Sequence, residues 1–439
     1  MPIIGPNQRL YADPKVTPDE TTFRQDNTSA AYYSSVYYKA HEKQVQPIPR
    51  PRNTAPMTLA DYIPPNLIQA IEKAGKITFH AVGDTGAAKA TRTETAATAI
   101  GHEGAVADAM ANDVASPNAN APAFFFHLGD VIYNFGEAQY YYDQFYEPFR
   151  AYDRPIFAIP GNHDGMVFGP NSAAPQTPTL AAFLTNFCAV APGLSPDAGG
   201  LVRSTMTQPG VYFTLDAPFV SIIGLYSNVL EGPGVISSQA GHFPIDDEQK
   251  TFLESELKRL KPMRDAGQRA VILALHHPPL SADAKHAGST GIQQDMDDCC
   301  KAAGLWPDLV LSGHAHLYQR FTRTTPSGKE TPYIVSGSGG FAATAPQATV
   351  TKAPITIGDH TLEILPIVAF GYLTITIDAK SLTVVFKTAD AKGIAIRDSV
   401  SVDLTTGKLA KQAQAIARPK TAPPQKKQPA KKARKKAPR

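Results

Sequence analysis

Five short polar motifs, each directly after an apolar run, constrain this 439-residue chain more than any other feature. They are Gly83-Asp84-Thr85-Gly86, Gly129-Asp130-Val131-Ile132-Tyr133, Gly161-Asn162-His163-Asp164, His276-His277-Pro278 and Gly313-His314-Ala315-His316. Short apolar runs of this kind predict buried strands. In sheets built from alternating strands and helices, ligands gather beyond the carboxyl ends of the strands. We therefore expect the polar side chains of the five motifs to meet at one edge of a sheet.

The pattern around the motifs predicts an α/β fold, because strands alternate with helices. Strands are expected over 76–82, 124–128, 156–159, 211–215, 220–225, 270–275 and 309–311. Helices are expected over 91–110 and after Asp246 or Asp247. Strand-rich segments later in the chain suit a second sheet packed on the first, and they are 333–336, 371–377 and 382–386.

Composition divides the chain into three parts. Residues 1–73 are rich in Tyr, Pro and Gln, so an extended N-terminal arm is expected there. Residues 74–407 carry the motifs and form the expected catalytic domain, and a hydrophobic content of 43% is ample for its core. Within it, 165–210 reads as a long loop, such as a lid. Residues 408–439 are expected to be a disordered basic tail, because their composition cannot form a core.

The end of the chain carries an uneven charge. Residues 418–439 contain ten Lys or Arg and no Asp or Glu. Because the whole chain has a net charge of +3, the remainder carries about −7. Two interpretations of the tail stay open: a solvated extension, or weak and non-specific binding to nucleic acid or another anionic surface. The tail has no aromatic residue that could stack on a base.

Cysteine use and hydropathy bear on the compartment. Three cysteines, Cys188, Cys299 and Cys300, do not make a disulfide framework. The first residues lack the apolar core of a signal peptide. No stretch is long and apolar enough to span a bilayer. We therefore expect a cytoplasmic protein with free thiols.

The residue types in the motifs suit metal ions. Carboxylates, imidazoles and amide oxygens are ligands for zinc, manganese and iron. A shared carboxylate holds two such ions about 3.5–4 Å apart, an arrangement that cleaves phosphate esters. Glycine before a ligand lets the backbone turn sharply and approach the ion. Asp and Asn alone are ordinary turn residues, so it is the ordered set that predicts a two-metal site.

The set resembles the metallophosphoesterase (calcineurin-like) superfamily, and within it the purple acid phosphatase branch, over residues 75–400. That branch has Gly-Asp-x-Gly, Gly-Asp-x-x-Tyr, Gly-Asn-His-Asp/Glu, a strand ending in His, and Gly-His-x-His. The segments 316–320 and 333–340 also resemble it. The resemblance implies a four-layer αββα sandwich of two mixed β-sheets flanked by helices, with the active site at one edge. It also implies hydrolysis of phosphate esters by a hydroxide bound to two metals.

The resemblance assigns a role to each matching residue. The first metal, a ferric ion, would be held by Asp84, Asp130, Tyr133 and His316. The second, iron, zinc or manganese, would be held by Asn162, His276 and His314, with Asp130 bridging both. His163 would donate a hydrogen bond or proton to the substrate, oriented by Asp164.

Gly86 and Tyr133 point to the purple branch. Most of the superfamily has a metal-binding histidine at the position of Gly86, whereas the purple branch lacks it. Tyr133 then supplies a phenolate instead. A hard phenolate favours trivalent iron, so this pairing indicates iron at the first site.

Other histidines have more than one interpretation. His277 follows His276 directly, and this His-His-Pro-Pro run is more typical of bacterial phosphodiesterases of the superfamily. We expect His277 to face the substrate. His286 is either a second substrate-binding histidine, as the family often has there, or a solvated loop residue. His127 is expected in the core or behind the metal ligands.

The leading hypothesis is therefore acid-phosphatase-like hydrolysis of a small-molecule phosphoester. The alternative within enzymes is a phosphodiesterase or nucleotide phosphatase of the same superfamily. A non-enzymatic alternative is binding to nucleic acid or an anionic surface through the tail.

Overall fold

The computed structural model describes residues 21–42, 45–86, 96–116, 120–133, 135–166, 178–228 and 232–410. Of the disordered basic tail expected at 408–439, Lys408 and Leu409 instead form a strand, because they pair with Asp403 and Val402, and residues 411–439 lie outside the described residues. The start of the expected helix, 91–95, also lies outside them. The same holds for 167–177 in the expected lid.

The helices of these residues are α1 (Ala30–Tyr33), α2 (Val36–His41), α3 (Pro65–Ala74), α4 (Ala96–Ala115), α5 (Asn162–Gly165), α6 (Ala181–Phe187), α7 (Glu248–Asp265) and α8 (Thr290–Ala303). Short 3-10 turns cover Leu59–Asp61, Ala138–Tyr140 and Pro196–Ala198, and a π-helical turn covers Tyr142–Tyr146. Among the described helices, none combines the length and apolar character that crossing a bilayer requires.

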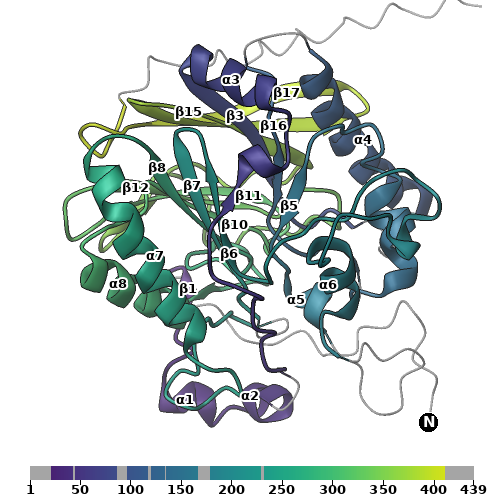
Figure 1. The fold of residues 1–439 in the computed structure, drawn as a ribbon. Coiled ribbons are helices and arrows are strands. Elements are labelled where there is room, and N and C mark those ends of the chain that lie inside the picture. The colour runs from purple at the N-terminus through teal and green to yellow at the C-terminus, as the bar shows by residue number, and fades with distance from the viewer. Residues whose placement is uncertain are drawn as a thin grey trace, which may run out of the picture.

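The described strands form two large mixed sheets and one small one (Figure 1). Sheet I has the order β13 (Ile355–Ile357), β14 (His360–Leu362), β11 (Tyr318–Thr324), β12 (Glu330–Ser336), β10 (Leu309–Ser312), β8 (Ala270–Leu275), β7 (Val220–Leu225), β6 (Phe213–Ala217), β2 (Met57–Thr58). Sheet II has the order β18 (Lys408–Leu409), β17 (Gly393–Asp403), β16 (Ser381–Asp390), β15 (Gly371–Asp378), β3 (Lys76–Val82), β4 (Phe125–His127), β5 (Ile156–Ala158). The small sheet pairs β1 (Arg24–Gln25) with β9 (Gly288–Ser289).

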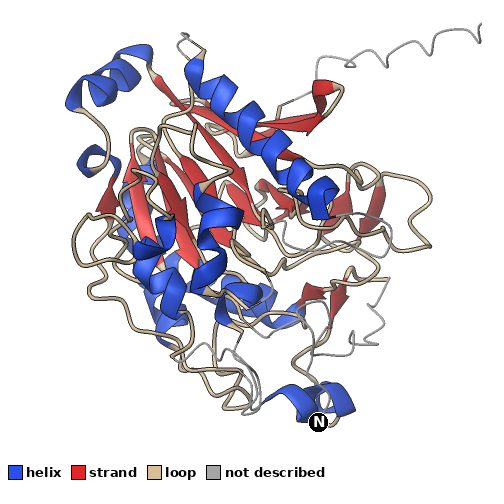
Figure 2. Cartoon of the chain, turned by 90° about the vertical axis from the view of Figure 1, so that its right-hand side faces the viewer, coloured by secondary structure: helices blue, strands red, loops and turns tan. Residues whose placement is uncertain are grey.

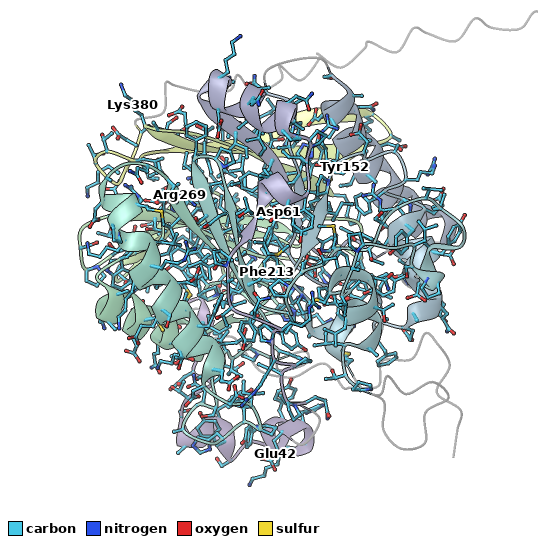
Figure 3. The ribbon with its side chains drawn as sticks, viewed as in Figure 1. Glu42, Asp61, Tyr152, Phe213, Arg269 and Lys380 are labelled. Carbon is cyan, nitrogen blue, oxygen red and sulfur yellow. The ribbon has the colours of Figure 1, made fainter. Side chains whose placement is uncertain are left out.

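The two large sheets pack face to face, and helices cover their outer faces. Alternate side chains of one strand therefore enter different cores: on β8, Ile272 lies between the sheets, whereas Val271 and Leu273 lie under the helices. Figure 1 shows α7 and α8 beside sheet I and α4 beside sheet II, and Figure 2 shows the layers from the side. In Figure 3, Phe213 lies in the interior while Lys380 reaches solvent. The predicted four-layer sandwich is confirmed.

Two predicted segments differ from the structure. The expected loop at 165–210 contains helix α6, whose Phe183 and Phe187 are buried in the core. A helix forms there because its apolar residues are spaced to cover the protein interior. Helix α4 continues to Ala115, five residues beyond the expected end at 110, because Val114 still packs in the core.

The segment before residue 74 contributes to the sheets. Strand β2 forms an edge of sheet I, parallel to β6. Strand β1 pairs in parallel with β9, next to the loop that carries His286. The expected boundary between an N-terminal arm and the catalytic domain stays a prediction.

Candidate metal centre

The ends of strands from both sheets converge on one edge of the sandwich. In sheet II, β3, β4 and β5 run in parallel, and Asp84, Asp130 and Asn162 follow them. In sheet I, the parallel strands β8 and β10 are followed by His276 and His314. All five side chains are buried. The two sheets thus supply complementary halves of one polar cluster.

The first half is rich in oxygen. The Tyr133 hydroxyl lies 3.0 Å from Oδ1 of Asp84 and 2.9 Å from Oδ2 of Asp130. Nε2 of His316 lies 3.4 Å from the same hydroxyl and 3.3 Å from Oδ1 of Asp84. Asp84, Asp130 and His316 are close enough together to hold one metal ion.

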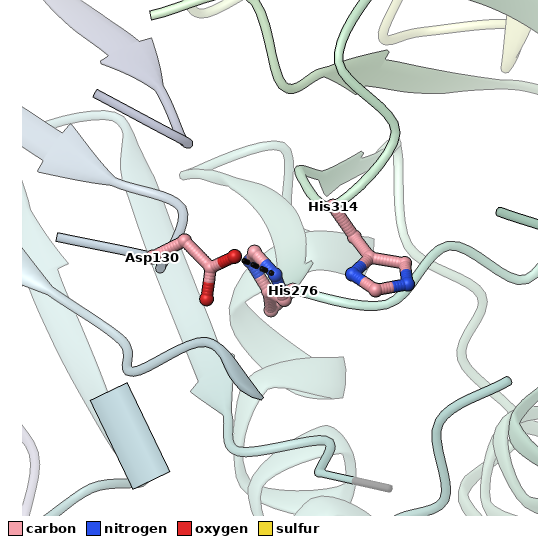
Figure 4. A group of neighbouring side chains, drawn as sticks. All are labelled: Asp130, His276 and His314. Carbon is pink, nitrogen blue, oxygen red and sulfur yellow. Dashed lines mark ion pairs between the residues drawn. The ribbon is translucent and has the colours of Figure 1, made fainter. Parts of the chain in front are cut away.

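The second half is rich in nitrogen and shares Asp130 with the first. Nε2 of His276 lies 3.3 Å from Oδ2 of Asp130 and 3.1 Å from Oδ1 of Asn162. Nδ1 of His314 lies 3.0 Å from the same Asn162 oxygen. Figure 4 shows the His276 ring between Asp130 and His314, and these three residues form a second group that could hold an ion.

The protonation of His276 shows that a cation fits the second half. Its Nδ1 lies 2.8 Å from the Leu128 carbonyl oxygen, which can only accept, so Nδ1 carries a hydrogen. Nε2 then faces two oxygens, those of Asp130 and Asn162. Burial alone would lower the pKa of His276, but Asp130 and other neighbours raise it to about 9. A proton or a metal ion at Nε2 would therefore satisfy both oxygens, and a backbone carbonyl on the other nitrogen is typical of a metal-binding histidine.

The surroundings of the Tyr133 hydroxyl indicate that a cation also fits the first half. It has one hydrogen to donate but faces two carboxylates, those of Asp84 and Asp130. Burial and then these negative charges raise the pKa of Tyr133 well above its usual value. A cation placed among the oxygens would remove this repulsion and stabilise the phenolate. The donor set fits a hard metal ion.

The backbone of the candidate ligands is strained. Asp84, Asp130 and His314 adopt left-handed conformations, with φ of 60°, 54° and 65°. Non-glycine residues with such angles cost on the order of 1–3 kcal/mol each and cluster at functional sites. Close packing also requires glycine nearby: a Cβ on Gly313 would lie 2.7 Å from Oδ2 of Asp84. The left-handed residues and the nearby glycine thus let the backbone approach the candidate ligand side chains closely at this edge of the sandwich.

His163 and Asp164 lie beside the cluster. The His163 ring is partly exposed, 4.4 Å from the Tyr133 ring, and its backbone N–H donates to Oδ1 of Asp130 at 2.9 Å. The Asp164 carboxylate is buried and accepts backbone N–H groups from Gly161, Val131 and Ile132. Burial and then the charge of Asp130 raise the pKa of Asp164 to about 7. Asp164 thus fastens the two ligand loops together, a role that was not predicted.

His277 and His286 flank His314. Their ring centroids lie 4.2 Å and 4.5 Å from that of His314. The interpretation of His286 as a solvated loop residue is wrong, because its side chain is 3% exposed. Its ring packs against His314 and His316, and its backbone N–H donates to Oδ1 of Asp283 at 2.8 Å. The structure therefore brings both predicted substrate-binding histidines to the cluster.

His127 links the loops of the first half from behind. The Gly129 N–H donates to Nδ1 of His127 at 3.1 Å, so the hydrogen sits on Nε2, which donates to Oγ1 of Thr85 at 2.9 Å. Burial lowers the pKa of His127 to about 3, which keeps the ring neutral. The prediction of a histidine behind the ligands thus matches its position.

Gln144 was missed by the sequence analysis. Lying in the π-helical turn, it accepts the Tyr133 N–H at 2.9 Å and donates to the Tyr133 carbonyl at 2.8 Å. The π-helical geometry, frequent at functional sites, is not readable from residue types, so no sequence signal marks Gln144.

Gly86 and Phe341 shape the space around the Tyr133 ring. A Cβ on Gly86 would press against the Gln144 amide and lie 3.0 Å from Cδ2 of Tyr133. On the other side, the Phe341 ring stacks on Tyr133 with centroids 3.6 Å apart and an angle of 1°. The Tyr133 ring is therefore stacked on Phe341, and a Cβ at position 86 would crowd its edge. Phe341 directly follows the segment 333–340 but was not singled out.

One solved structure supports the fold, and two others align with lower scores. A purple acid phosphatase from yellow lupin seeds aligns with a TM-score of 0.51 at 15% identity, over 84% of this chain and 59% of that protein. The chain thus spans 59% of the length of the lupin protein. The inner membrane complex anchor GAP50 of Plasmodium aligns with a TM-score of 0.48 at 12% identity, covering 77% of this chain and 90% of that one. A dimetal phosphatase from Danio rerio aligns with a TM-score of 0.42 at 13% identity, covering 75% and 99%.

Sequence comparison identifies the family. A search of curated proteins finds none that matches this sequence. A profile of the calcineurin-like phosphoesterases matches residues 77–318, more than half of the chain and all five motifs. Together with the sandwich and the polar cluster at its edge, this match shows that the chain belongs to the calcineurin-like phosphoesterase family.

Proposed function

We propose that this chain is an acid-phosphatase-like enzyme that hydrolyses small phosphate monoesters with two metal ions, the first of them iron. The observation that carries the proposal is that one buried carboxylate, Asp130, belongs to both ligand groups while the Tyr133 hydroxyl lies in the first. The first ion would be held by Asp84, Asp130, Tyr133 and His316. The second would be held by Asp130, Asn162, His276 and His314.

Two ions sharing a carboxylate lower the pKa of water, orient the phosphate and offset charge on the attacking and leaving oxygens. Side chains of the protein would bind the phosphate and donate the proton. His163 is partly exposed beside Tyr133, so it can donate a hydrogen bond to a phosphate oxygen or a proton to the leaving group. His277 and His286 lie against His314 and would bind the phosphate.

Metal analysis of the purified protein, combined with a substrate panel, tests the proposal. We expect about two ions per chain, as the shared carboxylate requires. Turnover of p-nitrophenyl phosphate should exceed that of bis-p-nitrophenyl phosphate. Faster diester turnover would favour the phosphodiesterase alternative, which the run His276-His277-Pro278-Pro279 motivates. Protein that is metal-loaded but cleaves neither ester would contradict the proposal.

The tail alternative needs its own experiment. Residues 418–439 lie outside the described residues. Deleting them should leave ester hydrolysis unchanged if the tail is an accessory. Any binding to nucleic acid that disappears with the tail should be sensitive to salt, because it would rest on phosphate contacts.

A further inference from the structure

Asn27 is fully buried where three segments of the chain meet. Its Nδ2 donates to the Gly234 carbonyl at 3.2 Å and to Oγ of Ser289 at 3.1 Å. Its Oδ1 accepts the Gly291 N–H at 2.8 Å. Oγ of Ser289 in turn donates to the Gly234 carbonyl at 2.6 Å. One amide thus joins the N-terminal segment, the loop at 232–236 and the start of α8.

The segment that carries Asn27 is itself held firmly. Phe23 is buried in the core, and its carbonyl accepts the Ser281 N–H at 2.9 Å. Strand β1 then pairs with β9. Beyond Asn27, Tyr32 and Tyr38 pack with Val235 in a small apolar cluster. Asn27 is therefore a fixed point against which the two loops can be held.

The two loops that Asn27 joins lie next to the candidate substrate-binding histidines, one of them in space and the other along the chain. The Gly234 backbone lies against His277, since a Cβ on Gly234 would come within 2.5 Å of the His277 side chain. The Ser289 N–H donates at 3.0 Å to the carbonyl of Pro278, the residue after His277. Ser289 also follows His286 by three positions. The amide of Asn27 therefore links the segment that contacts His277 with the segment that follows His286.

We infer that Asn27 is a positioning residue that holds His277 and His286 at the spacing needed to bind a phosphate group. The inference rests on the proposed function, in which these two imidazoles contact the phosphate. It makes the segment 23–27 part of the active-site architecture. Asn27 itself does not reach the reacting atoms; it acts through Gly234 and Ser289.

Asn27→Asp tests the inference, because it keeps size and Oδ1 but removes both donated hydrogen bonds. We expect KM for p-nitrophenyl phosphate and the inhibition constant of orthophosphate to rise at least about tenfold, because two hydrogen bonds are lost and each alone accounts for up to about tenfold. The kcat should stay within about threefold, because uniform binding is lost. Metal content should not change, and amide hydrogen exchange should accelerate at 232–236 and 286–291.

Two further variants make the result specific. Ser289→Ala removes the other donor to Gly234 and should shift KM and the inhibition constant in the same direction. Asp26→Ala changes the neighbouring residue, whose exposed carboxylate bonds only locally to Thr28 in the described contacts, and should leave all readouts unchanged. If Asn27→Asp fails to fold, the KM, the inhibition constant and the hydrogen exchange of Ser289→Ala decide whether the inference holds.

Unchanged KM, inhibition constant and hydrogen exchange in Asn27→Asp and Ser289→Ala would overturn the inference. So would a fall in kcat together with metal loss, because that pattern reports a disturbed metal centre. If the unaltered protein hydrolyses no phosphoester, the proposed function fails instead. Orthophosphate binding, measured by calorimetry on the metal-loaded protein, and hydrogen exchange would still decide the role of Asn27.

Discussion

Two polar clusters share strand β3 but are satisfied in different ways. In the middle of the strand, His80 lies 3.3 Å from Asp113, whose Oδ2 also accepts hydrogen bonds from Tyr372 at 2.8 Å and Lys387 at 2.6 Å. This cluster contains its own cation, Lys387. Beyond the end of the strand, Asp84 joins a cluster in which two carboxylates face one phenolic hydrogen.

The difference distinguishes a polar cluster that stabilises the fold from one that could bind an ion. In the candidate metal centre, Nε2 of His314 is buried and has no hydrogen-bond partner among the described residues. Such groups cost about 1–3 kcal/mol each when they stay unsatisfied. A cluster that completes itself stabilises the fold, whereas one that lacks a cation is built for an ion. Substitutions in the ion-binding cluster should therefore change activity, and substitutions in the self-contained cluster should change stability.

The largest effect is expected from Asp130→Asn. It removes the carboxylate shared by both ligand groups, so kcat should fall about 1,000-fold, the scale of losing a major electrostatic element of an active site. Metal content should drop below one ion per chain in elemental analysis. The metal-free variant should unfold at no lower urea concentration than metal-free unaltered protein. Retained turnover would contradict a shared bridging role.

Tyr133→Phe should have a smaller but more selective effect. The substitution removes one oxygen from the first half and leaves the second half intact, so we expect kcat to fall about 10- to 100-fold. If the first ion is ferric iron, the visible absorption of the oxidised protein should disappear. Iron-loaded protein that keeps its colour after the substitution would show that Tyr133 is not the ligand.

Asp113→Asn should affect stability and spare activity. Burial alone would raise the pKa of Asp113, but hydrogen bonds from His80, Lys387 and Tyr372 lower it below the usual range. A depressed pKa stabilises the fold above the unfolded value near 4, and this contribution is lost as the pH falls. The free energy of unfolding should drop by about 2 kcal/mol at pH 7.

Urea unfolding of both proteins from pH 7 to pH 3 checks this prediction. The difference between them should narrow below about pH 4, where Asp113 becomes protonated in the unfolded chain. Turnover should stay within about twofold of the unaltered enzyme, since the cluster completes itself without the ion. A difference that is constant with pH would mean that the ionised form is not what stabilises.

The smallest effect is expected from Phe341→Leu. This change keeps an apolar side chain over Tyr133 but removes the stacked ring, worth about 0.5–1.5 kcal/mol. Activity should change less than about fivefold, since no ligand is lost. The position of a phenolate absorption band should shift, because the stacked ring polarises the phenol. An unshifted band would show that Phe341 only fills space.

The fold and the convergence of the motifs could be predicted because their signals are local. A buried strand followed by Gly-Asp or Gly-Asn is readable within six or seven residues, and parallel strands bring such ends together. The contacts that hold the site were not readable. Asn27 and Ser289 are 262 positions apart, and neither side chain stands in a recognisable pattern.

Irregular segments also resisted prediction. Helix α6 arises in a stretch rich in loop-forming residues because tertiary packing of Phe183 and Phe187 overrides local preference. The His286 ring lies against His314 and His316, which are distant in sequence, so its burial could not be judged from its own neighbours.

The glycine at position 86 has an evolutionary consequence. A side chain there and the phenol of Tyr133 would compete for one volume, so the two positions cannot vary independently. Adding a histidine at position 86 first would crowd the phenol, and removing the phenol first would remove one candidate metal ligand. An exchange of Gly86 and Tyr133 for a histidine at position 86 without the phenol must therefore pass through a protein that binds the metal less well. Such an intermediate disfavours the exchange within a lineage.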